Sequence, residues 1–400
     1  MDEQHLWAPR PRTAPRPSRW GQFVGLAAGL LATALLAASC WFGFHAGHQR
    51  PDRPSAGVGI LRQMGHGHSL PTFGSTELHD ACAVIKIQDL NGLGVPLSEN
   101  EPVVQQRVDG SVLPEAAITQ SPADAAHCSY PLANGNTLTV TVHQTPFTAA
   151  ADLDFLKQAG YRAGATLKTE SDLSLAQWHD KQSDAQRLNA WKQDILIDVS
   201  IGTSKPWPAN GMDAPTLATK LEPLVTTAII TGPIGHTEHF YEDPFSRLRD
   251  PCESANYAAF DRAFPSHAGV SSIVRGTYHP TRSQSDVLMS CRRSNIVRGG
   301  SLNEVEHREL LVEFSVADSP QAARAENARF CSGSEVVDAT PSAGHARSCL
   351  VKSGTDWALW FQLDQVNIRV STPGLGGTAE EVGDRVVPAA LAIVEFGVNH

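Results

Sequence analysis

Apolar and polar residues alternate in several short runs of this chain, a pattern typical of half-buried β-strands. Residues 138–142 alternate leucine or valine with threonine, and isoleucine or valine occupies every second position of 195–201. Residues 357–370 contain two alternating runs on either side of Asp364 and Gln365, which predicts a hairpin. These runs favour antiparallel pairing.

Helical patterns lie between and after these strands. Ser319 and Pro320 suit the start of a helix, and Gly160 suits the end of one. Two of the predicted helices contain Pro223 and Pro388, which we expect to kink or break them. Antiparallel strands with segregated helices predict the α+β class. The predicted helices cover residues 149–160, 216–230, 319–331 and 378–395.

The longest apolar run, residues 21–44, contains no charged residue, and none lies between Arg19 and Arg50. As a helix it would be about 36 Å long, enough to cross a bilayer core. Four arginines precede the run and none follows it directly, which places the N-terminus in the cytoplasm. We therefore expect a basic, proline-rich cytoplasmic tail at 1–20, a single transmembrane helix at 21–44, and the bulk of the chain outside the cell membrane.

A cleaved signal is the alternative for the same run. It would be an ordinary secretory signal or a lipoprotein signal ending in LAASC, with Cys40 acylated. Against acylation, Ala37 stands where leucine is usual, and the apolar run continues through Phe44. In an uncleaved anchor Cys40 is a small apolar residue of the membrane helix. Each of these interpretations places the remainder of the chain outside the cytoplasm.

The charge of the chain is uneven. The net charge is −10, but the first twenty residues carry four arginines against Asp2 and Glu3, so the remainder carries −12. Phosphate contacts need an excess of lysine and arginine. The acidic body therefore argues against nucleic acid as a partner.

An internal repeat runs through the part of the chain that follows the apolar run. HDACAVI at 79–85 parallels RDPCESA at 249–255, and further matched features keep the same order at offsets between 163 and 172 residues. A repeat of this length is typical of a duplicated domain and not of a solenoid. We expect two tandem copies, 77–235 and 236–400, preceded by a flexible linker at 45–76 that is rich in Gly, Pro, Ser and His.

Six cysteines follow the apolar run, an even number that indicates three disulfides in an oxidising compartment. The repeat predicts one pair in each copy, and the two cysteines without counterparts should form the third. The expected pairs are Cys82 with Cys128, Cys252 with Cys291, and Cys331 with Cys349.

The Asp-Pro-Cys stretch that ends in Cys252 has a second interpretation. Asp250 and Pro251 predict a capped helix start, and Asp80 repeats the cap in the first copy. A thiol at a helix N-terminus has a lowered pKa and can be nucleophilic. The matching cysteine available in each copy favours a structural disulfide.

The Asp-Pro-Cys opening, the second cysteine before an alternating strand, and the late strand followed by an amphipathic helix resemble a known family. It comprises actinobacterial secreted proteins and lipoproteins of unknown function, with a partner cysteine about 40 residues after the opening, as Cys291 follows Cys252. The second copy resembles the family more closely. The first departs at Ala81, where the family has proline, and in its longer gap between cysteines. The resemblance implies an extracytoplasmic α+β domain similar to the PsbP-like fold and transfers no catalytic residue.

Two groups of histidines are candidate metal ligands, because neutral imidazoles bind zinc and copper. Both lie in linker-like sequence, and the His-Glu-x-x-His spacing of metalloproteases is missing. We expect no metal, no cofactor and no catalytic residue. The two groups are His66, His68 and His79, and His236 and His239 with Glu238, whose spacing fits one turn of a helix.

Other motifs have ordinary structural interpretations. The glycine-rich residues 373–381 precede a predicted helix and fit a strand-to-helix turn better than a phosphate-binding loop. Four tryptophans are expected to line a pocket or to pack in the core: Trp191, Trp207, Trp357 and Trp360.

These features predict a membrane-anchored extracytoplasmic protein that acts by binding and not by catalysis. Expected ligands are an envelope component, a small apolar molecule or a membrane-protein partner. Duplication favours binding, because two weak sites held together gain effective concentration. The alternatives are a sensory or regulatory ectodomain that signals through the membrane helix, and an extracellular hydrolase whose site residues meet only in space.

Overall fold

The computed structural model describes most of the chain after residue 60, as one compact unit. The predicted tail and transmembrane helix, with Cys40, lie outside the described residues. Among the helices within the described ranges, none is both long and apolar enough to cross a membrane. The described residues are 61–65, 70–73, 75–109, 125–163, 165–170, 172–207, 212–233, 235–241, 246, 248–265, 272–279, 287–295, 308–317, 319–333, 335–339 and 347–397.

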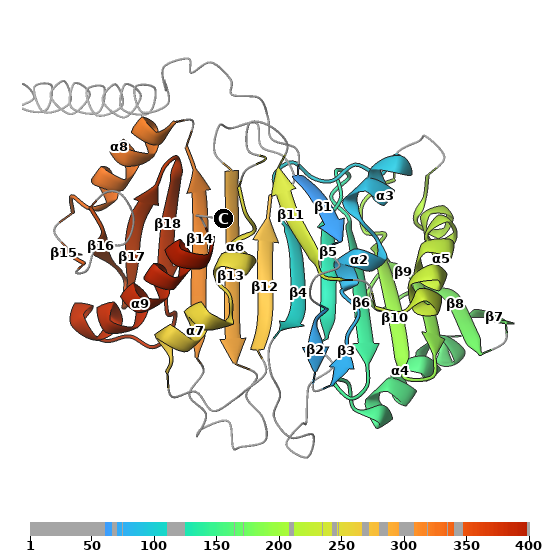
Figure 1. Cartoon of the computed structure of the whole chain (residues 1–400). Helices are drawn as coiled ribbons and strands as arrows, with labels where there is room; N and C mark the ends of the chain where they lie inside the picture. Colours follow the sequence, from blue (N-terminus) through green and yellow to red (C-terminus); the bar gives the residue numbers. More distant parts are fainter. Residues whose placement is uncertain are drawn as a thin grey trace, which may run out of the picture. The chain divides into compact units, whose positions relative to one another are not determined.

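Fourteen strands of this part of the chain form one antiparallel sheet (Figure 1). The strands from the first half of the chain are β4 (Val103–Asp109), β5 (Ala126–Pro131), β6 (Thr137–Gln144), β7 (Thr166–Glu170), β8 (Leu173–Asp180), β9 (Ala185–Lys192) and β10 (Ile195–Gly202). Those from the second half are β12 (Ser272–Tyr278), β13 (Val287–Asn295), β14 (Glu309–Val316), β15 (Val336–Asp338), β16 (Cys349–Ser353), β17 (Asp356–Leu363) and β18 (Val366–Ser371). The sheet confirms the predicted α+β class.

The remaining elements are helices and two small ladders. The helices are α2 (Ala81–Val84), α3 (Ile87–Gly92), α4 (Ala150–Arg162), α5 (Ala214–Thr231), α6 (Pro251–Ser254), α7 (Tyr257–Ala263), α8 (Pro320–Phe330) and α9 (Ala379–Gly397). One ladder pairs β1 (Leu61–Gly65) with β11 (Thr237–Tyr241), and the other pairs β2 (Thr72–Phe73) with β3 (Thr76–Glu77).

The two halves of the sheet have the same topology. From the centre outwards the first half runs β4-β5-β6-β10-β9-β8-β7, and the second runs β12-β13-β14-β18-β17-β16-β15. Each half has two short helices before its first strand, one helix after its third strand and one after its last. The halves meet where β4 pairs antiparallel with β12, with Gln106 opposite Arg275. The sheet is therefore continuous across the boundary that the sequence placed between two domains.

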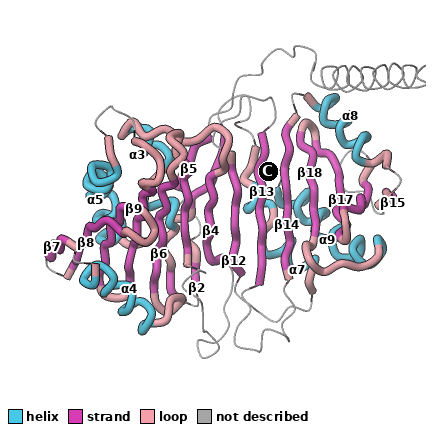
Figure 2. The backbone as a smooth tube through the Cα atoms, turned by 180° about the vertical axis from the view of Figure 1, so that it is seen from behind, coloured by secondary structure: helices cyan, strands magenta, loops and turns pink. Residues whose placement is uncertain are grey.

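The two faces of the sheet are covered differently. The helix face, seen in Figure 1, carries α2, α5, α6 and α9 over the main apolar core. The rear face, seen in Figure 2, carries α4 at one end and α8 at the other. Side chains alternate between the faces, so that in β14 the buried Val312 points to the helix face and Glu313 to the rear face.

Three disulfides fix helices to these faces. Their pairs are the ones expected from the repeat: Cys82–Cys128, Cys252–Cys291 and Cys331–Cys349. The first two join α2 and α6 to β5 and β13 on the helix face. The third joins the residue after α8 to the start of β16, so it fixes α8 to the rear face.

Two sequence expectations need correction, and a third is confirmed. The predicted flexible linker at 45–76 contains strand β1, in which Leu61 and Gln63 are buried, and its partner β11 is too distant in sequence for local composition to reveal. Helices α5 and α9 continue past Pro223 and Pro388 and are not broken. The predicted turn at 373–381 is present, with Gly374, Gly376 and Gly377 at positive φ just before α9.

Candidate functional site

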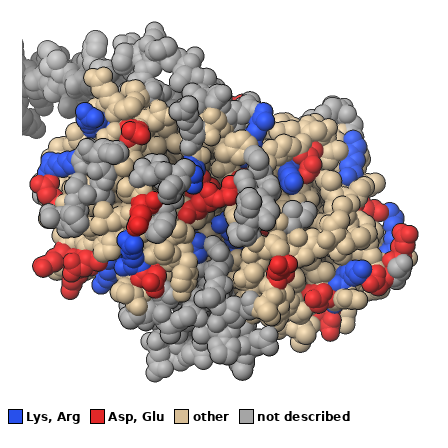
Figure 3. Space-filling view, viewed as in Figure 1, with Lys and Arg blue, Asp and Glu red and all other residues tan. Residues whose placement is uncertain are grey.

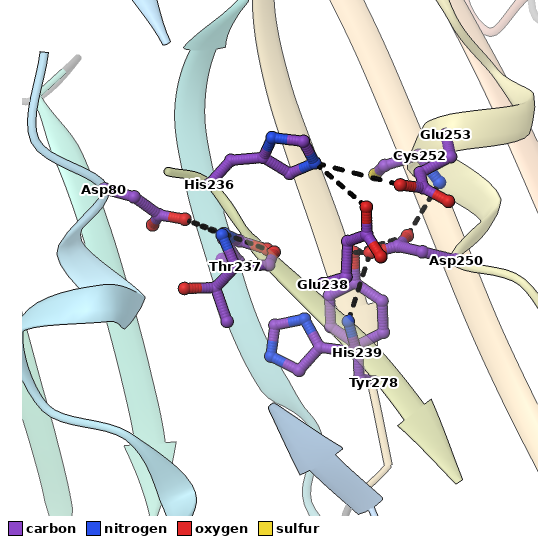
Figure 4. A network of polar contacts seen from close by, with 10 residues as sticks. Asp80, His236, Thr237, Glu238, His239, Asp250, Cys252, Glu253 and Tyr278 are labelled. Atoms are coloured by element: carbon purple, nitrogen blue, oxygen red, sulfur yellow. Dashed lines mark hydrogen bonds and ion pairs between the residues drawn. The ribbon is translucent and has the colours of Figure 1, made fainter. Parts of the chain in front are cut away.

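The helix face carries a buried polar network where the two halves meet (Figure 4). Asp80 and Asp250 cap α2 and α6, each accepting a hydrogen bond from the backbone N–H of the following cysteine residue, two positions on. Strand β11 lies between the two caps. The N–H of Thr237 donates to Asp80, and the N–H of His239 donates to Asp250 at 3.4 Å. One strand therefore connects the caps of both halves.

A second layer of the network surrounds Gln63 on β1. Its Nε2 donates to His239 Nε2 at 3.0 Å and to the hydroxyl of Tyr130 at 3.2 Å. Tyr130 donates to the carbonyl of Ile85, the residue that ends α2. At the corresponding place in the second half, Arg293 Nε donates to the carbonyl of Ala255 at 2.8 Å. The two halves thus use different side chains for one structural task.

Burial shifts the ionisation of this network. Desolvation lowers the pKa of His239 to about 3, and the positive charge of Arg107 adds to the effect. His239 is therefore neutral and stacks on Tyr278, with ring centroids 3.9 Å apart. Desolvation also raises the pKa of Asp250, although Arg107 and hydrogen bonds from Tyr278 and Cys252 oppose the shift. These groups form a buried, hydrogen-bonded core.

Three residues of metal-binding types converge beside this core. His236 Nε2 lies 3.3 Å from Glu238 Oε1 and 3.8 Å from Glu253 Oε1 (Figure 4). The three ligand atoms all lie within 4.8 Å of one another. A cavity of about 190 Å³ adjoins them and is lined by Leu70, Pro71, Arg107, His236, Cys252, Glu253, Asn256 and Arg293.

The predicted histidine groups are rearranged by the fold. His239 does not join His236, because β11 is a strand and not a helix, so His236 and Glu238 point one way and His239 the other. Glu253 of α6 completes the cluster. It was missed because no motif spacing links it to His236, and only the fold brings α6 beside β11. His66 and His68 lie outside the described residues, and His79 is buried, with its pKa lowered to about 4 by desolvation.

The rear face of the second half contains a larger cavity, of about 680 Å³. Its volume lies within the range typical of small-molecule sites. Trp360 on β17 and Phe330 on α8 stack at its edge, with ring centroids 4.1 Å apart. The lining residues are Thr277, His279, Leu288, Met289, Ser290, Glu313, Phe314, Ser315, Phe330, Val351, Lys352, Ser353, Ala358, Trp360, Asn367 and Arg369.

The lining combines aromatic and aliphatic side chains with polar ones, some of which are fixed by an ion pair or hydrogen bonds. Arg369 on β18 forms an ion pair with Glu313 on β14, directly opposite in the strand register. The same guanidinium lies 6.0 Å from the ring centroid of Trp360, within cation–π range. Asn367 donates to Glu326 of α8 at 2.9 Å, so the helix is held beside the cavity. A lining of aromatic, aliphatic and fixed polar groups can hold and orient a small organic ligand.

The first half uses the corresponding surface differently. Helix α4 covers it with a separate apolar cluster that includes Leu153, Trp191 and Leu196. The position of Arg369 is taken by Asp198, which accepts a hydrogen bond from Arg187 at 2.9 Å, and Asn189 stands near the position of Trp360. The described halves therefore share a scaffold and differ in the side chains of the rear face.

The four candidate tryptophans do not form one site. Trp360 lines the large cavity, and Trp357 lies beside Lys352 on the other face of β17. Trp191 packs under α4, and Trp207 lines a separate small cavity of about 180 Å³. The cavity residues from α8, β14 and β18 were missed, because only pairing across the sheet brings them together.

Comparison of the chain with family models, with curated proteins and with solved structures found no match.

Proposed function

We propose that this protein is an extracytoplasmic binding protein that holds a small, largely apolar molecule in the rear-face cavity of its second half. The observation that supports the proposal is the combination of size and lining. A space of about 680 Å³ is bordered by the Phe330–Trp360 stack and by aliphatic and hydroxyl-bearing side chains, with one ion pair at its floor. Such sites bind by apolar burial and orient the ligand through few polar contacts.

The polar side chains of the cavity lining suit a ligand with one polar end. Arg369 and Glu313 compensate each other's charge, so the cavity floor is polar without a large net charge. Asn367 at the floor can donate a hydrogen bond to an acceptor group. The proposed ligand is therefore a small amphipathic molecule, such as an envelope component.

The location of the protein is part of the proposal. Three disulfides persist in an oxidising compartment. The apolar run 21–44, with arginines before it, fits a single-pass membrane anchor whose N-terminus is cytoplasmic, and acylation of Cys40 is the alternative anchor. The ligand would then be met outside the cell membrane.

The duplicated architecture is also proposed. We interpret residues 77–235 and 236–400 as two copies of one domain that share a continuous sheet. The identical strand orders and the equivalent capped helices support this interpretation. In this view the second copy kept the binding cavity, and in the first copy α4 packs its own apolar cluster over the corresponding surface. Membership of the actinobacterial family remains a prediction.

Titration with the fluorescent probe anilinonaphthalene sulfonate tests the proposed site. The probe combines aromatic rings with one anionic group, which matches the cavity lining. We expect saturable binding to the full chain, and loss of affinity by roughly tenfold or more on Ser290→Phe. Ser290 lines the cavity and is half-buried, so a phenylalanine there fills space that the probe needs.

Ser129→Phe is the matched control. Ser129 and Ser290 lie in one row across the rear face, each one strand away from the central β4–β12 pair. Both substitutions add the same side chain to a half-buried serine, but only Ser290 lines the large cavity. Equal probe affinity in the two variants would refute the assignment of the site.

A further inference from the structure

We propose that His236, Glu238 and Glu253 bind a divalent transition-metal ion, with zinc as the expected ion. One imidazole nitrogen and two carboxylate oxygens form a common zinc donor set. The proposed metal site lies on the helix face, so it is separate from the rear-face cavity and does not depend on the proposed ligand.

The distances between the donor atoms suit one ion. Zinc lies about 2.0–2.2 Å from nitrogen and oxygen ligands, so neighbouring donors of a tetrahedral site are about 3.4 Å apart. His236 Nε2 and Glu238 Oε1 are 3.3 Å apart, and His236 Nε2 and Glu253 Oε1 are 3.8 Å apart. A small inward rotation of Glu253 would complete three corners of a tetrahedron.

The electrostatics of the cluster point to a cation. The two carboxylates present oxygens within 4.8 Å of each other around a single imidazole. Two carboxylates this close repel each other unless positive charge lies between them. Figure 3 shows a group of acidic side chains near the middle of this face. A divalent ion would neutralise both carboxylates at once.

Two arginines line the adjoining cavity and set a limit on affinity. Arg293 donates through Nε to the carbonyl of Ala255, and Arg107 lies close enough to Asp250 to lower its pKa against the effect of burial. The positive charges of these two arginines repel the proposed metal ion and so lower the affinity of the site for it. The cavity also leaves room for a water molecule as a fourth ligand.

The backbone holds the donors in place before the ion arrives. His236 and Glu238 flank Thr237, whose N–H is fixed by Asp80. Glu253 follows Cys252 in α6, which the Asp250 cap and the disulfide to Cys291 fix to the sheet. Ligands on supported elements lose little entropy on binding a metal. The ion would bridge β11 and α6, next to the contact between the halves.

Calorimetric titration of the metal-free full chain with zinc chloride tests the site. We expect wild type to bind one more zinc equivalent than the His236→Ala and Glu253→Gln variants. Zinc should also raise the unfolding temperature of wild type more than that of either variant, because binding to the folded state stabilises it. Glu253→His should keep the site, since imidazole is also a zinc ligand.

His179→Ala is the matched control. His179 lies on β8, is about half exposed, and pairs at 3.8 Å with Asp184, far from the cluster in the sheet order. Removing it deletes a surface imidazole without touching the proposed donors, so zinc stoichiometry should stay at the wild-type value. The proposal is overturned if His236→Ala and Glu253→Gln bind zinc with the stoichiometry and affinity of wild type.

Discussion

At the residue scale, buried polar residues connect the short helices to the centre of the sheet. The caps Asp80 and Asp250 each accept hydrogen bonds from elements beyond their own helix, so each joins a helix start to the centre of the sheet. Sequence predicted both caps, because Asp before a cysteine-bearing turn is a local signal. It could not predict Tyr130 and Arg293, since their carbonyl partners are defined only by the fold.

Three buried histidines make stability depend on pH. Burial lowers the pKa of His79 and His143 to about 4 and that of His239 to about 3. The unfolded chain, with histidine pKa values near 6.5, binds more protons than the folded chain between these limits. The contribution of these histidines to the free energy of unfolding is therefore complete above about pH 6.5, and it is lost as the pH falls towards 4. Each histidine contributes up to about 1.4 kcal/mol per pH unit.

Urea unfolding at several pH values measures this dependence. The His143→Gln variant should show a shallower slope between pH 6 and 4.5, by roughly one proton. His143 suits the test because desolvation is the cause of its shift and its Nδ1 has no hydrogen-bond partner among the described residues. An unchanged slope in the variant would show that His143 is already protonated in the folded chain.

At the scale of elements, disulfides fix three of the described helices to particular faces of the sheet. Two disulfides fix α2 and α6 to the helix face, and the third fixes α8 to the rear face beside the large cavity. Phe330, the last residue of α8, precedes Cys331 and forms part of the cavity edge. The third disulfide therefore positions a wall of the proposed binding site.

Replacing Cys331 and Cys349 by serine should impair both stability and binding. The pair closes a loop of 18 residues, so its loss should lower the free energy of unfolding by about 3 kcal/mol. It should also weaken binding of the anilinonaphthalene sulfonate probe, because α8 loses its covalent anchor. Chemical denaturation and probe titration measure the two effects.

The double serine variant of Cys82 and Cys128 provides the comparison. That pair closes a loop of 46 residues in the first half, so its loss should cost about 4 kcal/mol. Probe affinity should stay at the wild-type value under conditions where the protein remains folded. If both variants lost probe affinity equally, α8 would have no specific role in the cavity.

The sequence predicted the strands with clear alternation and the cysteine pairs, but not the elements whose partners are distant in sequence. Alternation located strands such as β6, β10, β17 and β18, and the repeat gave the three cysteine pairs. Strand β1 was taken for linker, because its surroundings are rich in glycine and histidine and its partner β11 is more than 170 positions later. The three-residue spacing of His236 and His239 fits a helical turn, but His239 lies in strand β11, where every second residue is buried. The histidine spacing alone does not distinguish the two structures.

At the scale of the whole molecule, one continuous sheet combines two halves of equal topology. The pairing of β4 with β12 and of β1 with β11 leaves no separate bodies within the described unit. The rear faces of the halves nevertheless differ, with a cavity beside Trp360 in one and the packed cluster of Trp191 in the other. The proposed duplication would account for the shared scaffold, and divergence of the rear face would account for the proposed binding site.

Neither candidate site could be predicted from local sequence. The large cavity takes residues from six strands and a helix, and each contributes only one to three side chains. The acidic and histidine cluster needs Glu253, which reaches His236 only because β11 passes α6. Motif spacing does not reveal which side chains from different elements lie together in a site, because the packing of those elements decides it.

A crystal structure of the full chain grown with anilinonaphthalene sulfonate tests the central claim most directly. The account predicts one ordered probe on the rear face, with its rings against Trp360 and Phe330 and its sulfonate near Arg369. Density for the probe only on the helix face or on the first half would contradict the account. So would an empty cavity at probe concentrations that saturate the fluorescence signal.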